Sequence, residues 1–394
     1  MPIGLYLSVP FCRTKCTYCN FASDVFSRAV FERYIDRVCA DIHSTPETAR
    51  LMGGRFDDEV DSIYLGGGTP TVLDSQQLER LFVTVMQNFR LSANAEVTVE
   101  CAPGTLHNTV LETLLRCGVN RVSLGVQSFI DQEAASVGRL HKNATVLDDV
   151  DRLRRAGIAN INVDLIAGLP YQTAESWSVS LQRAVDLGVP HVSVYMLEVD
   201  EDSRLGRELI AGGTRYHAHF VPDQELTARF YETACVDLDA ANVCQYEISN
   251  FARSGFLSRH NLKYWKRLPY VGLGVDAHSM LPCANDEWES VRFSTADSLE
   301  QYVAGAPVAR TAVSVQSALE ETFFLGLRVT EGVNLADVRT RFGNSFVDAF
   351  DPTLAELSDG ELIDRSGDRI RLTPRGRLVS NEVFERFLGE QSTR

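Results

Sequence analysis

The sequence predicts an α/β protein built around a parallel sheet, either open or curled into a complete or partial barrel. Short β-rich runs alternate with amphipathic stretches through the first half of the chain, and each stretch is long enough to form a crossover helix. The six expected strands are Ile3–Val9, Ser62–Leu65, Glu96–Glu100, Arg121–Gly125, Ile161–Ile166 and His191–Met196. The four expected crossover helices are Gln76–Asn88, Asn108–Cys117, Thr145–Ala156 and Ala174–Leu187.

The regular alternation stops after Met196. Residues 198–222 are polar and contain glycine, and the next helix is expected over Asp223–Ala240. The stretch Gln245–Met280 is rich in Tyr, Trp, His, Asn and Gly but has no clean periodicity. That composition is typical of a packed loop region or a binding surface.

The last part of the chain predicts a small winged-helix-like unit. Helical runs are followed by two short strands and a final helix: Ser317–Val329, Leu335–Phe342 and Asn344–Leu357, then strands near Glu361–Asp364 and Arg369–Leu372. Residues 311–394 contain 10 basic and 14 acidic residues, so a DNA-binding wing is the less favoured use.

The composition indicates an ordinary globular protein. The 394 residues, 44% of them hydrophobic, can form two or three domains. We find no signal peptide and no apolar run of about 18 residues, so we expect a cytoplasmic protein that is not an integral membrane protein. The net charge of −15 repels a phosphate backbone, so no nucleic-acid partner is expected. Nine cysteines without an export signal favour reduced thiols or metal ligands over disulfides.

Three cysteines, Cys12, Cys16 and Cys19, lie directly after the first expected strand, where a loop can fold them around one metal centre. A structural zinc site normally needs four protein ligands, and neither Asn20 nor Phe21 supplies a fourth. Three thiolates suit an iron–sulfur cluster that keeps one iron open for an external ligand. The alternatives are a zinc site and three unrelated buried cysteines.

The spacing C-x-x-x-C-x-x-C resembles the signature of the radical S-adenosylmethionine (SAM) superfamily, and Tyr18 supplies the aromatic residue before the third cysteine. The resemblance implies a [4Fe–4S] cluster whose open iron is chelated by the amino and carboxylate groups of SAM. It also implies electron transfer that cleaves the sulfonium to a 5′-deoxyadenosyl radical, while the protein places the cofactor and excludes water.

Further candidates for SAM binding lie near the carboxyl ends of later strands, where parallel α/β barrels place their sites. Gly66–Pro70 resembles the family loop that binds the methionine amino group, and its glycines allow a close backbone approach. A carboxylate, an amide and a guanidinium can satisfy the ribose hydroxyls and the methionine carboxylate. Tyr6 matches a family tyrosine near the cofactor, although a strand tyrosine is as often core. The predicted SAM residues are Tyr6, Tyr18, Gly67, Gly68, Thr69, Glu100, Gln127, Arg139 and Asp164.

Over essentially its whole length the chain resembles the branch that contains oxygen-independent coproporphyrinogen III oxidase and the HemW-type haem chaperones. The stretches that carry this resemblance are Gly66–Pro70, Glu100–Thr105, Val126–Phe129, Asp164–Pro170 and Gln245–Ala252. One departure is Ala102, which stands where the family commonly has asparagine. The resemblance implies a partial (β/α)6 TIM-like radical SAM barrel with an α/β extension and a winged-helix-like C-terminal domain. The expected divisions are residues 1–222 (barrel), 223–310 (linking region) and 311–394 (HemN-like C-terminal domain).

Three features favour the chaperones over the oxidase. The oxidases carry a further cysteine two residues after the third, where this chain has Phe21. They also have an N-terminal extension, whereas only eleven residues precede Cys12 here. Residues 260–264, with the sequence HNLKY, match the HNxxY motif of the haem-binding group.

The HNxxY motif supplies the candidate haem ligands. A neutral imidazole nitrogen of His260 can ligate haem iron, Tyr264 can share its helical face or offer a phenolate, and Trp265 can pack on the porphyrin. The alternative is an aromatic stretch that simply caps the barrel. Other histidines that could ligate haem are His278, His217 and His219.

The expected function is therefore that of a haem chaperone, which passes its cargo haem to a membrane-associated respiratory acceptor. The cluster and SAM would serve regulation, dimerisation or a radical step, and a homodimer stays open. We expect no coproporphyrinogen oxidase activity. The alternatives are a coproporphyrinogen III dehydrogenase that decarboxylates two propionates through substrate radicals, a radical SAM methyltransferase or cyclopropanase, and a structural zinc protein.

Overall fold

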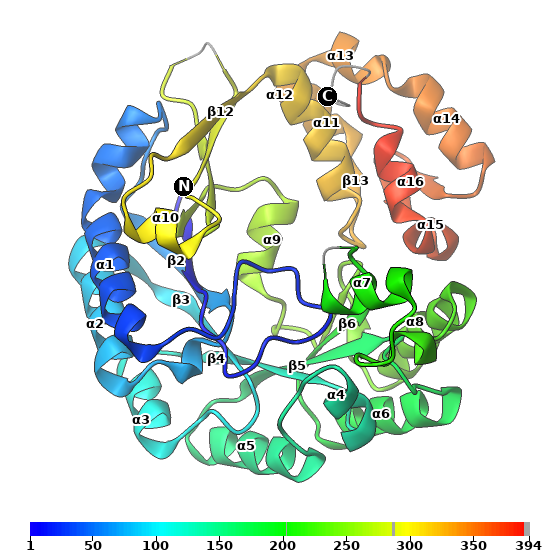
Figure 1. Ribbon diagram of the computed structural model, residues 1–394. Helices are drawn as coiled ribbons and strands as arrows, with labels where there is room; N and C mark the ends of the chain where they lie inside the picture. The colour runs from blue at the N-terminus through cyan, green and yellow to red at the C-terminus, as the bar shows by residue number, and fades with distance from the viewer. Residues whose placement is uncertain (202, 286–287, 390–394) are drawn as a thin grey trace.

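Six parallel strands form the centre of the molecule. The computed structural model describes residues 1–201, 203–285 and 288–389. The six expected strands are confirmed, and they lie side by side in chain order. Figure 1 shows them curling around an interior, with helices on the outside. The strands are β1 (Ile3–Val9), β2 (Glu59–Gly67), β3 (Arg90–Cys101), β4 (Arg121–Gln127), β5 (Asn160–Ala167) and β6 (His191–Met196).

The outer helices pack apolar faces against this sheet. The expected helices are confirmed as α2 (Ser75–Asn88), α3 (Asn108–Arg116), α5 (Asn143–Arg155), α6 (Ala174–Asp186) and α8 (Gln224–Ala240). The sequence reasoning did not anticipate α1 (Arg28–Leu51), whose buried residues include Phe31, Ile35, Val38 and Ile42. These residues follow a helical period, but Pro46 inside the helix weakens the signal.

The sheet continues past both ends of the six strands. β9 (Tyr270–Leu273) pairs in parallel with β1. β8 (Asn250–Ala252) pairs antiparallel with β6 at the other end. No pairing closes the sheet within the part of the chain that the structure describes, so an α/β fold with an open, partly curled sheet is confirmed. The remaining strands are β7 (Cys244–Gln245), β10 (His278–Pro282), β11 (Ser290–Ser294) and β12 (Ala309–Val313), all in antiparallel pairs.

The expectation of a loop region over Gln245–Met280 is wrong in part. The helix α9 (Arg259–Trp265) lies within this stretch, contacts β2 and α11 (Val315–Gly326), and is drawn within the ring of strands in Figure 1. Seven residues are too few to show a helical period in the sequence. Other short elements that were not expected are η1 (Pro70–Val72), α4 (Asp131–Ser136), α7 (Arg204–Ala211), η2 (Ala218–Phe220) and α10 (Leu299–Val303).

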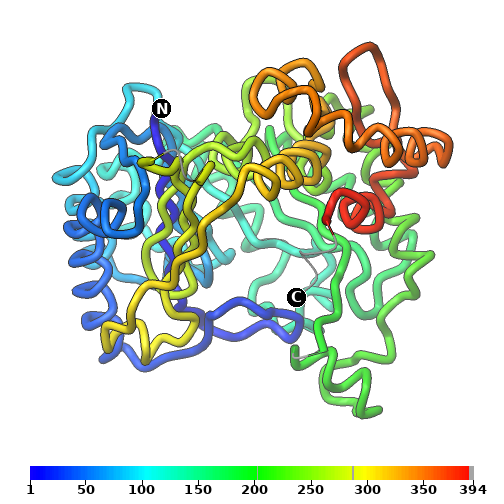
Figure 2. Tube along the Cα trace, turned by 90° about the horizontal axis from the view of Figure 1, so that it is seen from above, coloured from blue at the N-terminus to red at the C-terminus, as the bar shows by residue number. Residues whose placement is uncertain are grey.

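The C-terminal part has its own cluster of buried apolar side chains. Figure 2 shows it to one side of the strands. The helix expected over Asn344–Leu357 is two helices, because Pro352 favours a new helix start. The elements are α12 (Leu335–Phe342), β13 (Val333–Asn334), α13 (Asn344–Asp348), α14 (Asp351–Asp359), β14 (Ile363–Ser366), β15 (Arg369–Leu372), α15 (Pro374–Leu378) and α16 (Ser380–Glu385). Among the described residues, none of the helices combines the length and apolar character needed to cross a membrane.

Candidate functional site

The loop between β1 and α1 carries the three clustered cysteines. Cys12, Cys16 and Cys19 are partly buried and reduced. The Cys12 N–H donates to the carbonyl of Asp24 at 3.0 Å, and the Cys19 N–H donates to the carbonyl of Cys16 at 3.3 Å. Figure 1 shows this loop crossing in front of the ring of strands. The backbone itself therefore holds the three cysteines in one compact segment.

The three thiols lie close enough to influence one another. Burial raises the pKa of the Cys12 thiol, the hydroxyls of Ser23 and Thr69 lower it, and the charges of Cys19 and Cys16 raise it further. Within the described ranges, no three Cys, His, Asp or Glu side chains gather as tightly as one metal ion requires. A [4Fe–4S] cluster binds its thiolates to different irons and needs no such tight group. The donor set and its spacing therefore fit a cluster.

The glycine run after β2 packs directly against the cysteine loop. The N–H of Gly68 donates to the carbonyl of Val9 at 2.8 Å, and the N–H of Thr69 donates to that of Phe11 at 2.8 Å. A Cβ placed on Gly68 would lie 2.8 Å from both of these carbonyl oxygens and 3.0 Å from the Cys12 sulfur. Position 68 therefore has to be glycine if Cys12 is to stay where it is.

Glu100 is the second-last residue of β3 and lies next to the glycine run. Its carboxylate accepts a hydrogen bond from the Gly67 N–H at 3.1 Å and another from the Tyr64 hydroxyl at 2.8 Å. Burial raises the pKa of Glu100 to about 7, and the charge of Asp164 adds to this, while both hydrogen bonds and Arg139 lower it. Glu100 is thus a carboxyl group that changes protonation near neutral pH.

Arg139 places an unpartnered donor in the same region. Its Nη2 donates to the Tyr18 hydroxyl at 3.1 Å. Its Nε is buried and has no hydrogen-bond partner among the described residues. A Cβ placed on Gly125 would lie 3.2 Å from Arg139 Nη2 and 3.1 Å from Gln127 Nε2, so the guanidinium and the amide lie side by side. A buried donor without an acceptor is costly, so this geometry fits a ligand that brings a carboxylate.

Asp164 occupies the next strand, within a polar network. Its carboxylate accepts from the Ser123 hydroxyl at 3.0 Å and from Asn162 Nδ2 at 2.7 Å. Burial raises the pKa of Asp164, and these hydrogen bonds lower it. The charge of Asp164 also acts on Glu100, so the two carboxylates face one interior.

Tyr6 reaches the same interior from β1. A Cβ placed on Gly67 would lie 3.3 Å from its hydroxyl, and its ring centroid is 6.2 Å from that of Tyr64. The fold therefore brings all the predicted SAM residues to the carboxyl half of the curled sheet. Sequence reasoning missed Tyr64, which shares one strand face with Ser62 and Gly66, and this period of two is the signal that could have found it.

His260 and Tyr264 lie nearer the amino ends of the strands, and the His260 ring packs on Tyr64 with 5.3 Å between the ring centroids. A Cβ placed on Gly4, near the start of β1, would lie 3.2 Å from the His260 ring. His260 Nδ1 shares a hydrogen bond with the Ser62 hydroxyl at 3.0 Å, and Nε2 shares one with the Tyr264 hydroxyl at 2.8 Å. The side chain is 1% exposed, and burial lowers the pKa of His260 to about 3, so the imidazole is neutral. Both nitrogens of the proposed ligand are thus engaged by protein groups.

The three other candidate histidines lie elsewhere. The Nε2 of His278 is exposed and 3.7 Å from a carboxylate oxygen of Asp276. His217 Nδ1 shares a hydrogen bond with the Tyr171 hydroxyl at 2.9 Å, and His219 belongs to the same turn. These histidines therefore do not share a site with His260.

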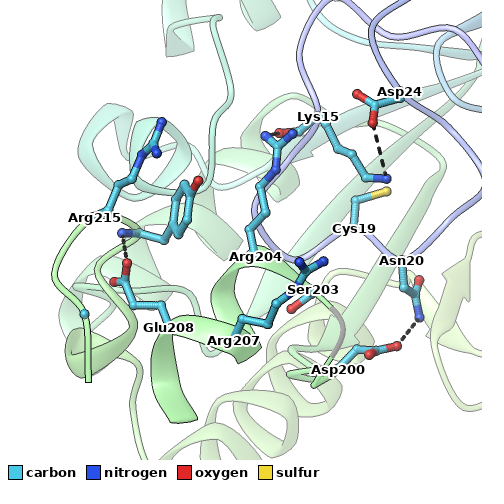
Figure 3. Close-up of a pocket in the computed structure, with 12 residues that line it drawn as sticks. Lys15, Cys19, Asn20, Asp24, Asp200, Ser203, Arg204, Arg207, Glu208 and Arg215 are labelled. Atoms are coloured by element: carbon cyan, nitrogen blue, oxygen red, sulfur yellow. Dashed lines mark hydrogen bonds and ion pairs between the residues drawn. The ribbon is translucent and has the colours of Figure 1, made fainter. Parts of the chain in front are cut away.

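A cavity of about 880 Å³ opens beside Cys19, as Figure 3 shows. Asn20 Nδ2 donates to Asp200 at 3.2 Å, and Lys15 lies 3.8 Å from Asp24, so part of the charge in its wall is paired. Of the predicted site residues, only Cys19 lines it. Sequence reasoning missed this cavity because its lining comes from two distant segments: Lys15, Cys19, Asn20, Asp24, Asp200, Ser203, Arg204, Arg207, Glu208, Gly213, Arg215 and Tyr216.

Comparison with known proteins identifies the class. Residues 6–197 match the radical SAM superfamily model, and residues 313–379 match that of the HemN C-terminal domain. The solved structure of coproporphyrinogen III oxidase (HemN) from Escherichia coli, a radical SAM enzyme, is similar with a TM-score of 0.82. That match covers 98% of this chain and 90% of HemN at 24% identity. The fold and the cysteine loop thus define a protein of the radical SAM superfamily.

Full-length relatives narrow the class. Heme chaperone HemW of Lactococcus lactis is 33% identical over 98% of this chain and 97% of its own length. HemW of Bacillus subtilis is 34% identical over 98% and 99%, and HemW of Escherichia coli is 29% identical over 99% of each chain. The chain belongs to the HemW family.

Proposed function

We propose that this protein is a haem chaperone, which binds haem and passes it to an acceptor protein. The observation that carries the proposal is the full-length similarity to proteins named heme chaperone HemW, at 33% and 34% identity for two of them. The residues agree with this choice, because Phe21 stands where the oxidase pattern has a further cysteine and α9 carries the HNxxY motif.

The proposal includes a [4Fe–4S] cluster on Cys12, Cys16 and Cys19, with SAM on its open iron. Bound together, the two groups supply one-electron chemistry at the sulfonium. The unpartnered Nε of Arg139 supports a contact to the methionine carboxylate, because a buried guanidinium donor needs an acceptor. The loop of Gly67, Gly68 and Thr69 would take the methionine amino group. The other residues proposed to surround SAM are Tyr6, Tyr18, Glu100, Gln127 and Asp164.

His260 and Tyr264 remain the proposed haem residues, and the structure adds a condition to this role. Nε2 of His260 can ligate iron only after its 2.8 Å hydrogen bond to Tyr264 breaks, because one ring nitrogen cannot serve both the tyrosine hydroxyl and a metal. Haem binding at this end would therefore move Tyr264 and part of α9. The neutral state of His260, which follows from its lowered pKa, suits a metal ligand.

The proposal extends to partners and organisation. We propose a cytoplasmic chaperone that delivers haem to a respiratory acceptor, does not bind nucleic acid and can form a homodimer. We also keep the division into residues 1–222, 223–310 and 311–394. The separate buried cluster of the C-terminal part supports the last boundary.

One paired experiment tests this function. Haem is titrated into the anaerobically reconstituted protein, and coproporphyrinogen turnover is assayed on the same preparation. We expect a Soret band that saturates at about one haem per chain, weaker binding by His260→Ala, and no protoporphyrinogen. Turnover with consumption of SAM would instead support the dehydrogenase.

A further inference from the structure

Arg328, just after α11, lies where the C-terminal part meets α9. Its guanidinium carbon is 4.4 Å from the ring centroid of Trp265 and 5.8 Å from that of Phe384. Its carbonyl accepts from the N–H of Ile248 at 3.1 Å, which fixes its backbone beside the turn between β7 and β8. Arg328 therefore stands at the β7 end of the strand order, on the open side of the curled sheet.

The guanidinium has aromatic neighbours but no acceptor. Its Nε is buried without a hydrogen-bond partner, and no hydrogen bond or ion pair of this side chain occurs within the described residues. Burial lowers the pKa of Arg328, so the charge is partly removed from water. The indole Nε1 of Trp265 is also buried and unpartnered. Buried donors of this kind are rare in folded proteins and indicate a missing acceptor.

The acidic groups near Arg328 do not supply that acceptor. The charges of Glu247 and Glu198 raise the pKa of Arg328, but no ion pair joins either carboxylate to Arg328 among the described residues. Glu247 accepts a hydrogen bond from Asn250 through Oε1, whereas its Oε2 is buried without a partner, and burial raises the pKa of the carboxyl. The Nε donor of Arg328 and the Oε2 acceptor of Glu247 thus both lack a hydrogen bond within the described residues, and a ligand with a carboxylate would have to be preferred by the guanidinium over Glu247.

Arg328 faces the interior that holds the SAM candidates. Tyr195, at the end of β6, is 42% exposed, although burial raises the pKa of its hydroxyl well above the usual range. Tyr195 shares its strand face with Ser193, whose hydroxyl accepts from Asn162 beside Asp164, so its side chain points to the same interior. The charges of Asp164 and Glu247 act on Tyr195, and Tyr195 in turn acts on Arg328. One interior therefore carries two guanidinium groups with unpartnered donors, Arg139 and Arg328.

We infer that Arg328 binds a carboxylate of the ligand that enters this interior from its open side, with the face of Trp265 as the apolar surface beside it. A guanidinium binds a carboxylate through two parallel hydrogen bonds. The contacts with the rings of Trp265 and Phe384 hold the plane of the Arg328 guanidinium in place. This inference rests on the proposed function, and it adds which chemical group of the ligand the protein recognises. For a haem chaperone, the carboxylate is a propionate of the haem.

The test compares haem with haem dimethyl ester, which keeps the macrocycle and iron but lacks carboxylates. Both ligands are titrated into anaerobically reconstituted full-length protein, as wild type, Arg328→Gln, Arg328→Lys and Arg33→Gln. Arg33 is the control, because it is exposed on the outer helix α1. Thermal unfolding of each variant shows that it is folded, and Arg328→Lys keeps the charge if Arg328→Gln unfolds.

We expect the wild type and Arg33→Gln to bind haem at least about tenfold tighter than the diester. Arg328→Gln should lose this preference and bind the diester as the wild type does, with Arg328→Lys in between. Equal binding of haem and diester by the wild type overturns the inference, as does an equal loss of both ligands in Arg328→Gln. Failure of the wild type to bind haem at all would instead reject the proposed function.

Discussion

The two ends of the curled sheet are prepared for ligands in different ways. At the carboxyl ends of the strands, Arg139 keeps a buried donor without a partner, and Gly68 leaves just enough room for Cys12. At the amino ends, His260 has hydrogen bonds to Ser62 and Tyr264 on both ring nitrogens. The first end is preorganised for a ligand, whereas the second has to give up a protein contact before a metal can bind.

The largest expected effect concerns Glu100 at the preorganised end. Its pKa is raised from 4.5 to about 7, so the folded protein holds a proton that the unfolded chain releases. This contribution to stability is fully present below pH 4.5 and is lost as the pH rises through about 7. We expect Glu100→Gln, measured without SAM, to remove a pH dependence of about 3 kcal/mol in the free energy of unfolding.

Urea unfolding at pH 5 and pH 8 measures this difference. Glu225→Gln is the control, because Glu225 is an exposed helix residue paired with Arg229. If the free energy of unfolding changed equally between pH 5 and pH 8 in the wild type and in Glu100→Gln, Glu100 would not be the buried carboxyl group described here.

A second prediction tests the close contact at Gly68. An added methyl group would overlap two carbonyl oxygens and press on the Cys12 sulfur, so Gly68→Ala should displace the loop. We expect the cluster to be held about 10- to 100-fold more weakly. Iron and sulfide per chain after anaerobic gel filtration measure this loss.

The matched control for that variant is Gly360→Ala. A Cβ there would lie 3.3 Å from the nearest atom, in the C-terminal part and away from the cysteine loop. Full iron content in Gly68→Ala would show that the glycine run does not hold Cys12 in place.

The smallest expected effect concerns the rate of haem uptake at His260, near the amino ends of the strands. Tyr264→Phe removes the hydrogen bond that occupies Nε2 of His260. If release of that bond limits ligation, the variant should take up haem about fivefold faster, since one neutral hydrogen bond contributes roughly 1 kcal/mol. Stopped-flow measurement of the Soret change gives the rate. Unchanged or slower uptake would mean that release of this hydrogen bond does not limit ligation, and His260→Ala shows which part of the signal depends on the imidazole.

Much of the fold could be read from local patterns, and the misses have clear causes. The six strands were found because they are short β-rich runs, and four of them are followed by a long amphipathic stretch. The helix α9 was taken as part of a loop region, because its seven residues form a helix through Ser258 as the cap and through packing on β2 and α11. A single serine cap is a weak signal in the sequence, and the packing is not visible without the neighbouring elements. The cavity beside Cys19 was missed for the same reason.

By itself, the sequence determined the class of the site: three cysteines within one loop, a glycine run after the second strand, and polar residues at successive strand ends. These features depend on spacing along the chain, and spacing is local. The tertiary structure decided which groups are free to act. Whether His260 is already engaged, or whether Arg139 and Arg328 lack acceptors, depends on side chains far away in the sequence, because hydrogen bonding and burial are set by what the fold brings together.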